Sequence, residues 1–493
     1  MATRDIIDAN LSEDNWRKML LSPSPSLLRR RPCNAEHGAR AYRHRRVKRA
    51  LAVALLILIV GCMPASGPTT PPTRPPASEP PATQPASPIA AVGEIVEARS
   101  DVARNPIDAA TSEQLTEMVA ADRAFAFDLY RTLVAEEDGN LFISPYSIST
   151  AMSMVLPGAR GETAEELASA LGVGADKSAW HHARNRLELE LSDLNNREPP
   201  GNRDLVPMTL ERTNAIFGQV GYPFEQDFLD ILAANYGAGM NALDFARDWE
   251  AARAAINAWV AERTRDRIEE LLPDGSIDDA TRAVLVNAIF FKANWQFPFD
   301  PERTRTARFN LLDGSTVDVP LMQGSIRLDY AAGDGWQAVE LPYVGGASMI
   351  VLVPDEGRYA NVEGRLDEEL LAELSGALSV HQVELGLPRW ESLSSLDLIP
   401  PLKALGVEDL FDESRADLSG IAGSRDLYVT GVFHDANITV DEVGTEAAAA
   451  TAVVVGEVSA PPPATLTVDR PFIYLIRDDA NGEILFLGRL LEP

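Results

Sequence analysis

The sequence predicts a large folded body that mixes α-helices with β-strands. Residues Leu115–Glu136 place apolar side chains at helical spacing, and Gly139-Asn140 ends this helix. Ala283–Phe291 is instead a nearly continuous apolar run, as expected of a strand buried on both faces. Because signals of both kinds recur along the chain, neither an all-helical nor an all-strand fold is expected.

The other expected elements follow the same mixture. Expected strands are Leu141–Ile143, Met208–Gly218, a hairpin over Ala338–Pro354 around Gly345-Gly346, Val383–Pro388 and Tyr428–Val440. Expected helices are Ser147–Leu156, one beginning near Thr163, Trp180–Leu194, Phe224–Tyr236, Trp249–Leu272 and Leu396–Leu405.

The N-terminus is interpreted as a targeting segment. A basic block, Arg43–Arg49, precedes the 11-residue apolar run Ala50–Val60, which is too short to cross a bilayer as a helix and fits a signal-peptide core. The run ends at Gly61-Cys62 and resembles a bacterial lipobox, in which the cysteine becomes the lipidated first residue. An ordinary signal peptide with a chance cysteine and an uncleaved anchor are the alternatives. The long leader suggests a start assigned too far upstream, with Met19 available.

A tether is expected between this leader and the folded body. Met63–Pro88 is dense in Pro, Thr, Ser and Ala and cannot bury a core. We therefore expect residues 1–61 to be the signal-peptide region, 62–112 the tether and 113–493 the folded domain. The expected location is the bacterial cell envelope, extracellular or periplasmic, with a lipid anchor at Cys62. Processing there leaves no cysteine for a disulfide in the body.

Charge excludes one class of partner. Residues 1–61 hold 12 basic and 5 acidic residues, and the rest of the chain holds 32 basic and 68 acidic ones, a net charge of −36. A body this acidic repels phosphate backbones, so no nucleic-acid partner is expected.

The sequence lacks the common motifs of enzyme active sites. There are six histidines, and HExxH, a Cys/His ligand set, a glycine-rich phosphate loop and GxSxG are all absent. We therefore expect no enzyme activity, no cofactor and no metal.

The most informative stretch is Asp441–Ser459. Gly444 and Thr445 are followed by Glu446, by Ala447, Ala448, Ala449 and Ala450, and then by the β-branched run Thr451–Val455. If the segment is a strand, alternate residues share a face, and the side chains on one face are small at its start and apolar at its end. Such a segment can lie outside as a loop or enter a sheet as a strand; a solvent-exposed alanine linker is the alternative.

Its flanks resemble those of a known family. GVFHDANITVDEVGTEAAAA and DRPFIYLIRDDANGEILFLGRLLEP are similar to the hinge strand and C-terminal signature of serpins, the serine-protease-inhibitor superfamily. NLFISPYSISTAMSMVLPGARGETAEELASALG and AVLVNAIFFKANWQFPF resemble two further serpin blocks. By this resemblance, Ser144, Ser147, Asn287 and His434 belong to the shutter beneath the central sheet, and Trp295 to the breach at its top. From the residues alone, the serines are equally N-cap or turn residues, and His434 is a structural histidine.

The resemblance implies an α+β fold of the multi-domain type, with three β-sheets, about nine helices and an exposed reactive loop near the C-terminus. A target serine protease cleaves the loop, which then inserts into the central sheet and traps the covalent acyl-enzyme. Burying three valines contributes about 5–9 kcal/mol gross, so the uncut fold is expected to be a kinetic trap. Charge or bulk at Thr445 would stall the insertion.

Spacing from Gly444 places the reactive bond at Val458-Ser459, with Glu457 or Ala460 as neighbouring choices. Val458 is small and apolar, which suits elastase-like proteases. The helix that binds heparin in some serpins here carries only Arg184 and Arg186 beside three acidic residues, so heparin-type activation is not expected. A monomer is expected. The alternative function is a non-inhibitory binding or scaffold protein of serpin fold on the cell surface.

Overall fold

The computed structural model describes residues 91–195, 208–445 and 461–493. The chain separates into two compact units, Met1–Glu79 and Pro80–Pro493, and every described residue belongs to the second. Among these residues, no helix combines the length and the apolar character needed to cross a membrane.

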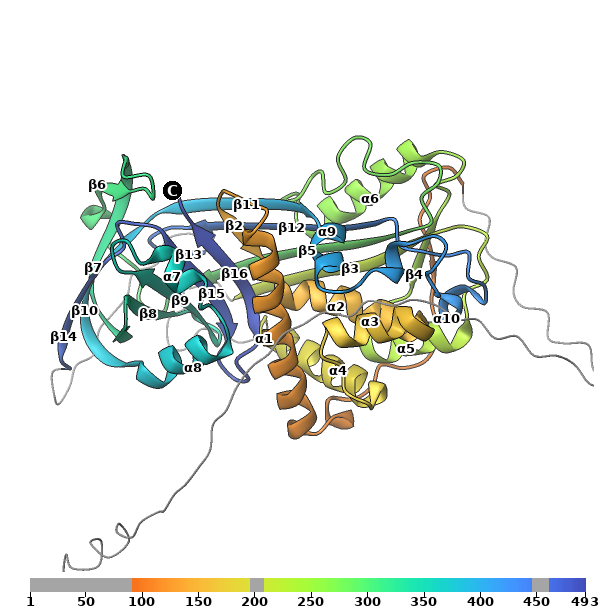
Figure 1. Ribbon diagram of the computed structural model, residues 1–493, viewed down its shortest axis with the longest axis horizontal. Coiled ribbons are helices and arrows are strands. Elements are labelled where there is room, and N and C mark those ends of the chain that lie inside the picture. Colours follow the sequence, from red (N-terminus) through yellow and green to blue (C-terminus); the bar gives the residue numbers. More distant parts are fainter. Residues whose placement is uncertain (1–90, 196–207, 446–460) are drawn as a thin grey trace, which may run out of the picture. The chain divides into compact units, whose positions relative to one another are not determined.

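Ten α-helices are found in the described part of the chain (Figure 1). They are α1 (Ser112–Val134), α2 (Pro145–Val155), α3 (Gly161–Ala170), α4 (Lys177–Leu194), α5 (Gln226–Tyr236), α6 (Trp249–Arg263), α7 (Tyr359–Glu363), α8 (Glu368–Ala377), α9 (Ile399–Ala404) and α10 (Ser419–Ala422). Short 3₁₀ helices are η1 (Ile107–Ala109), η2 (Leu156–Gly158), η3 (Pro301–Arg303) and η4 (Asp409–Phe411). The α6 helix ends at Arg263, earlier than the expected Leu272. Its C-cap is Thr264, and the next two residues, Arg265 and Asp266, have positive φ.

A seven-stranded sheet lies at the centre, in the order β1-β4-β3-β5-β13-β12-β11. Its strands are β1 (Val96–Ala98), β3 (Thr209–Gln219), β4 (Met240–Leu243), β5 (Ala283–Asn294), β11 (Trp390–Asp397), β12 (Gly431–Val440) and β13 (Gly444–Thr445). We call it the central sheet. Figure 1 shows α6 on one of its faces and α2 on the other.

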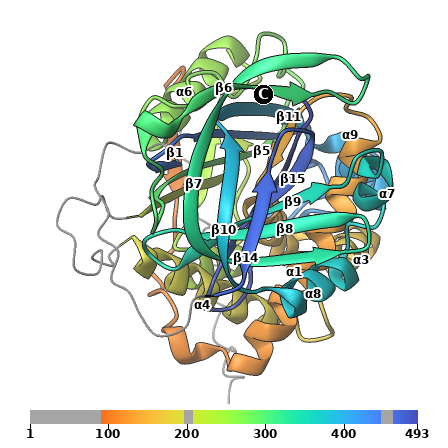
Figure 2. The same ribbon diagram turned by 90° about the vertical axis from the view of Figure 1, so that its left-hand side faces the viewer.

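The remaining strands form one nine-stranded sheet, with β14-β10-β7-β8-β9-β15-β16-β2 in order and β6 paired to β7. These are β2 (Leu141–Ile143), β6 (Arg305–Asn310), β7 (Thr316–Gly333), β8 (Trp336–Pro342), β9 (Ala347–Pro354), β10 (Ser379–Pro388), β14 (Pro463–Thr467), β15 (Phe472–Asp478) and β16 (Ile484–Leu490). Three separate sheets were expected, but hydrogen bonding joins the described strands into two sheets. The reason is the 18-residue strand β7, whose first part pairs with β6 and β10 and whose last part pairs with β8. In Figure 2, β8 and β9 are turned across β7, β10 and β14.

Two apolar cores confirm that β5 is buried on both faces. Its Leu285, Ile289 and Phe291 belong to the large core that includes α2, whereas Val284 and Val286 belong to a smaller core with α6. Eleven of the twelve residues of β5 are buried. This double burial explains the continuous apolar run, because an alternating polar pattern would place a polar side chain in one core.

The α2 helix supports the central sheet from below and is wholly buried. Its N-cap is Ser144, whose hydroxyl accepts a hydrogen bond from the Ser147 amide, and Pro145 occupies the first turn, where its missing N–H costs nothing. Serine, threonine and alanine let this helix pass close under the strands.

The N-terminal segment before α1 differs from the expected tether. Residues 94–111, which we call the strap, include β1 and follow the edge of the central sheet: Val96–Ala98 pairs antiparallel with Met240–Ala242. Ile95 packs against the smaller core. The folded unit thus begins before the expected boundary at Glu113, because this segment has both a strand edge to pair with and an apolar residue to bury.

Candidate functional site

The site lies where β5 and β12 meet in the central sheet, which we call the seam. In its lower half the strands pair directly and in parallel, Gly431–Ala436 against Val284–Ile289. In its upper half β13 lies between them, with Gly444 opposite Asn294 and Thr445 opposite both Ala293 and Val440. The hinge that precedes the predicted loop has therefore already entered the sheet by two residues.

Gly444 fits this position because no side chain does. A Cβ atom on Gly444 would lie 2.1 Å from the carbonyl oxygen of Ala293 and 2.8 Å from the Cα of Asn294. Both contacts are with backbone, so neither can be relieved by rotating a side chain. The small residue predicted for the leading end of the hinge is thus required by the close approach of β5.

Thr445 is fully buried under the breach. Its exposed fraction is 0%, and its hydroxyl lies 2.7 Å from the hydroxyl of Tyr343. The Tyr343 ring stacks on the predicted breach residue Trp295, with ring centroids 4.4 Å apart, and the Trp295 indole N–H donates to the carbonyl of Asp441 at 3.0 Å. Burial raises the pKa of Tyr343, so the hydroxyl stays neutral and can donate. Trp295 therefore holds both the entering hinge and the turn that leads to it.

Glu442, two residues before Gly444, is held at the same end of the seam. Its carboxylate accepts from the Arg389 guanidinium at 2.9 and 2.5 Å and from the Thr304 hydroxyl. Burial favours a raised pKa for Glu442, but these hydrogen bonds outweigh it and the pKa is lowered. The carboxylate stays ionised and fixes the start of the hinge.

The shutter residues meet beneath the lower half of the seam. The Asn287 side-chain amide donates to the Ser147 hydroxyl at 2.6 Å and to the Asn214 side-chain oxygen at 2.5 Å. The Ser147 hydroxyl in turn donates to the Asn214 oxygen at 3.0 Å. The Ser144 hydroxyl donates to the carbonyl of Leu485 at 2.6 Å. The four predicted side chains are thus brought together by α2, β5 and β12.

His434 joins the two sides of the seam. The Ser144 amide donates to His434 Nε2 at 3.1 Å, so that nitrogen carries no proton, and His434 Nδ1–H donates to the side-chain oxygen of Asn287. Burial lowers the pKa of His434 to about 3, and the hydrogen bond with Asn287 offsets only part of this. His434 is therefore neutral and held in one tautomer by two buried hydrogen bonds, an arrangement consistent with the structural role expected of it.

Sequence reasoning missed five residues of the site: Asn214, Thr304, Tyr343, Arg389 and Glu442. Asn214 and Tyr343 lie in a predicted strand and hairpin, and no local signal distinguishes them from other polar residues there. The predicted hinge residues Glu446, Ala447, Ala448, Ala449 and Ala450, the reactive bond Val458-Ser459 and Cys62 lie outside the described residues. In the part of the chain that is described, no group of acidic, histidine or cysteine side chains is arranged to hold a metal.

Comparison with known proteins gives the family. The family model for serpins, described as serine protease inhibitors, matches residues 120–493. Leukocyte elastase inhibitor from Bos taurus is 39% identical over 390 residues, which cover 77% of this chain and all of the relative. The chain therefore belongs to the serpin family of serine protease inhibitors, which is not a family of catalytic enzymes.

Solved structures agree with this assignment. Serpin48, a highly specific serpin from the insect Tenebrio molitor, is 31% identical with a TM-score of 0.67, over 76% of this chain and 98% of its own. Thyroxine-binding globulin in complex with thyroxine is 28% identical with a TM-score of 0.66, over 76% of this chain and 99% of its own. These neighbours confirm the α+β serpin fold.

The two arginines considered for heparin on α4 offer little to a polyanion. The Arg184 guanidinium on α4 is completely buried and forms two hydrogen bonds, of 2.5 and 2.6 Å, with the Asp122 carboxylate on α1. Arg186 pairs with Glu190 one turn away. One of the two basic side chains thus serves to dock α4 on α1.

Proposed function

We propose that this serpin inhibits elastase-like serine proteases as a suicide substrate, with Val458-Ser459 as the bond that the protease cleaves. The observation that carries the proposal is the position of Gly444 and Thr445, already paired between β5 and β12. After cleavage, the residues that follow would continue this strand down the seam and take the trapped protease with them.

The side chains around the seam suit this motion. Below the hinge, β5 and β12 pair directly and in parallel over Val284–Ile289 and Gly431–Ala436, and this pairing has to part for a new strand to enter. The small residues after Thr445 would meet little steric resistance, and the valines would bury apolar surface. The similarity to leukocyte elastase inhibitors, 36–39% identical for the Homo sapiens and Bos taurus proteins, supports an elastase-like target.

The test is to mix the uncleaved protein with neutrophil or pancreatic elastase. We expect a complex that survives SDS and, in the denatured sample, a separate C-terminal peptide that begins at Ser459; in the folded protein β14, β15 and β16 hold this peptide in the sheet. Val458→Arg should move trapping from elastase to trypsin, because a trypsin-like pocket needs a basic side chain. If every protease of a panel cleaves the loop without forming a stable complex, the protein is a substrate and not an inhibitor.

The second candidate is a non-inhibitory binding or scaffold protein with the same fold. One neighbouring structure, thyroxine-binding globulin, is solved with a bound small ligand, which supports considering it. Thermal unfolding before and after loop cleavage separates the two functions. An inhibitor gains much stability when the loop inserts, whereas a scaffold whose loop stays outside gains little.

We further propose that the protein is exported as a monomer and attached to a bacterial cell envelope by a lipid on Cys62. The apolar run before Gly61-Cys62 and the Pro-rich segment after it support this. Mass spectrometry of the mature N-terminus should find a lipidated cysteine, and Cys62→Ala should release the protein from the membrane fraction. A mature chain that begins elsewhere would exclude the anchor.

A further inference from the structure

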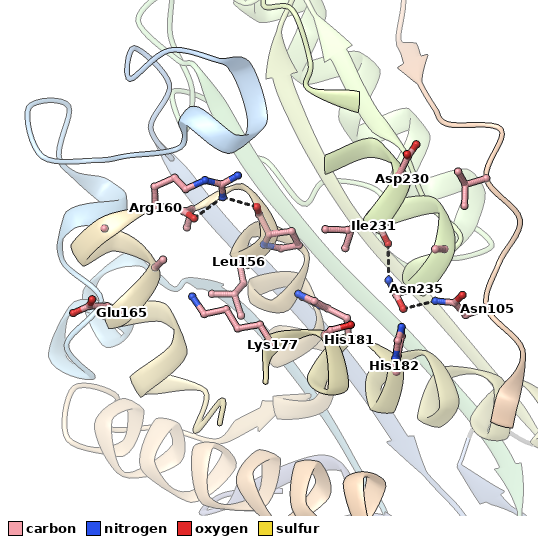
Figure 3. Close-up of a pocket in the computed structure, with 17 residues that line it drawn as sticks. Asn105, Leu156, Arg160, Glu165, Lys177, His181, His182, Asp230, Ile231 and Asn235 are labelled. Carbon is pink, nitrogen blue, oxygen red and sulfur yellow. Dashed lines mark hydrogen bonds between the residues drawn. The ribbon is translucent and has the colours of Figure 1, made fainter. Parts of the chain in front are cut away.

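A cavity of about 670 Å³ lies away from the seam, beside α4 (Figure 3). Its walls come from η2 and the start of α3, from α4, from α5 and from the strap, which contributes Val102 and Asn105. Small-molecule sites in proteins have about 300–1,000 Å³, so the cavity has the size of a binding site. The inhibitory mechanism makes no use of it.

The inner wall of the cavity is largely apolar. Apolar side chains come from η2 and α3, with Leu156, Pro157 and Ala164, and from α5, with Ile231 and Ala234. The backbone of this wall is held in place, because the Asn105 amide donates to the carbonyl of Ala234 at 2.7 Å. Such walls suit the hydrocarbon part of a ligand.

His181 supplies a hydrogen-bond acceptor within these apolar walls. The hydroxyl of Tyr236 donates to the carbonyl of Ser153 at 3.1 Å, so its oxygen must accept from His181 Nδ1–H at 2.7 Å. The neutral ring therefore keeps a lone pair on Nε2. His181 is only 5% exposed and lines the cavity, and no partner for Nε2 is found among the described residues.

Lys177 supplies a positive charge one turn before His181. Its ammonium group forms no ion pair within the described ranges. Figure 3 shows Lys177, Leu156 and His181 gathered at the α4 side of the cavity, with Glu165 at the end away from His181. The other lining carboxylate, Asp230, is occupied by Ser100 at 2.5 Å and Gln226 at 2.7 Å.

We propose that this cavity binds an amphipathic organic acid that also carries a hydroxyl group. The carboxylate pairs with Lys177, the hydroxyl donates to His181 Nε2, and the hydrocarbon lies against Leu156 and Ile231. The ligand supplies a partner to each of these groups: the exposed Lys177 ammonium, the His181 Nε2 acceptor at the cavity and the apolar wall.

The test is calorimetric titration of the full-length, uncleaved protein with 10-hydroxydecanoate. We compare it with decanoate, which lacks the donor, and with decane-1,10-diol, which lacks the charge. We expect saturable one-to-one binding of the hydroxy acid, with decanoate roughly fivefold weaker because it leaves His181 Nε2 unpaired. The diol should be about threefold to fivefold weaker because it forms no ion pair at the exposed Lys177.

Variants place the binding in the cavity. Lys177→Met should erase the preference for the acid over the diol, with Lys403→Met, an exposed lysine on α9, as the matched control. Ala234→Trp should abolish binding by filling the cavity. His181→Phe should equalise the hydroxy acid and decanoate; if this variant is poorly folded, the ranking of the three probes on the native protein and the Ala234→Trp result decide. Absence of saturable binding by all three probes, or undiminished binding to Ala234→Trp, would overturn the proposal.

Discussion

The central sheet is held in two different ways at two places, the seam and the strap edge. At the seam, β5 and β12 meet over a small polar network, and the hinge already separates them at the top. At the strap edge, β1 pairs with β4, and strap side chains bond to the helices beside it, as when Arg104 donates to Asn185 on α4 at 2.8 Å. The seam can admit a further strand between β5 and β12, whereas the strap edge is already paired with β1.

The difference shows where such a sheet is expected to part. The shutter bonds at the seam join β12 to β5 and α2 through the side chains of His434 and Asn287, and they exist only while the strands stay together. The strap instead ties β4 to α5, through Ser100 and Asp230, so that sheet edge and helix form one block. Changes at the seam should therefore alter trapping, and changes at the strap should alter stability alone.

The largest effect is expected from Thr445→Arg. Thr445 is completely buried between β5 and β12, and an arginine there must give up its hydration to enter the seam, at a cost of several kcal/mol. The fraction of elastase trapped should fall by about tenfold or more, while the loop is still cleaved. Gel analysis of complex against cleaved inhibitor measures both.

The matched control is Thr465→Arg. Thr465 is also a strand threonine, but it is exposed on β14, beyond the predicted reactive bond. This variant should trap elastase as the native protein does. Equal complex yields for Thr445→Arg and the native protein would show that trapping does not require a small side chain at Thr445 between β5 and β12.

A smaller effect is expected from Asn287→Ala at the shutter. The change removes the donors to Ser147 and Asn214 and the acceptor of His434, and each buried polar group left unpaired costs about 1–3 kcal/mol. We expect the first unfolding transition of the uncleaved protein in denaturant to lose roughly 3 kcal/mol or more. Asn361→Ala, which alters an exposed asparagine, should change it by less than about 0.5 kcal/mol. A similar loss in both variants would show that the shutter hydrogen bonds do not stabilise the uncleaved protein.

Much of this arrangement was predictable from sequence. Asn287 stands out as the one polar residue inside the apolar run of β5, and the glycine-alanine hinge is distinctive, so these residues identified the family. Partners that come from other strands were not predictable. Tyr343 lies in a hairpin 102 residues before Thr445. The two side chains meet only because β5 ends beside that hairpin, where Trp295 pairs with Tyr343. The strand β1 was not predicted, because three residues have too little periodicity to signal a strand.

The protonation of His434 should make the seam sensitive to acid. The pKa of His434 is about 3 in the folded protein and about 6.5 when unfolded, so the unfolded chain binds a proton that the folded chain cannot. Stability is complete above pH 6.5 and is lost as the pH falls toward 3. At pH 5 the loss is about 2 kcal/mol.

The change His434→Gln isolates this contribution. Glutamine can accept from Ser144 and donate to Asn287 but does not titrate. Burial raises the pKa of the neighbouring Asp435 to about 7, which acts in the opposite direction, and buried His181, with a pKa of about 4, acts in the same direction. Both are present in either protein. The stability difference between native and variant should therefore shrink by about 2 kcal/mol from pH 7 to pH 5. A constant difference would show that His434 does not titrate between the two states.

The smallest effect is expected at the strap, from Ser100→Ala. The Ser100 hydroxyl donates to the Asp230 carboxylate at 2.5 Å and accepts from the Val102 amide at 3.1 Å, and Asp230 keeps its bond from Gln226. Because one carboxylate partner remains, we expect a loss of about 1 kcal/mol in the free energy of unfolding. The fraction of elastase trapped should not change, since β1 and β4 lie on the far side of β3 from the seam. If Ser100→Ala instead shifts the ratio of trapped to cleaved product, the strap and the seam are coupled through β3, and the edge helps to decide how readily the sheet opens.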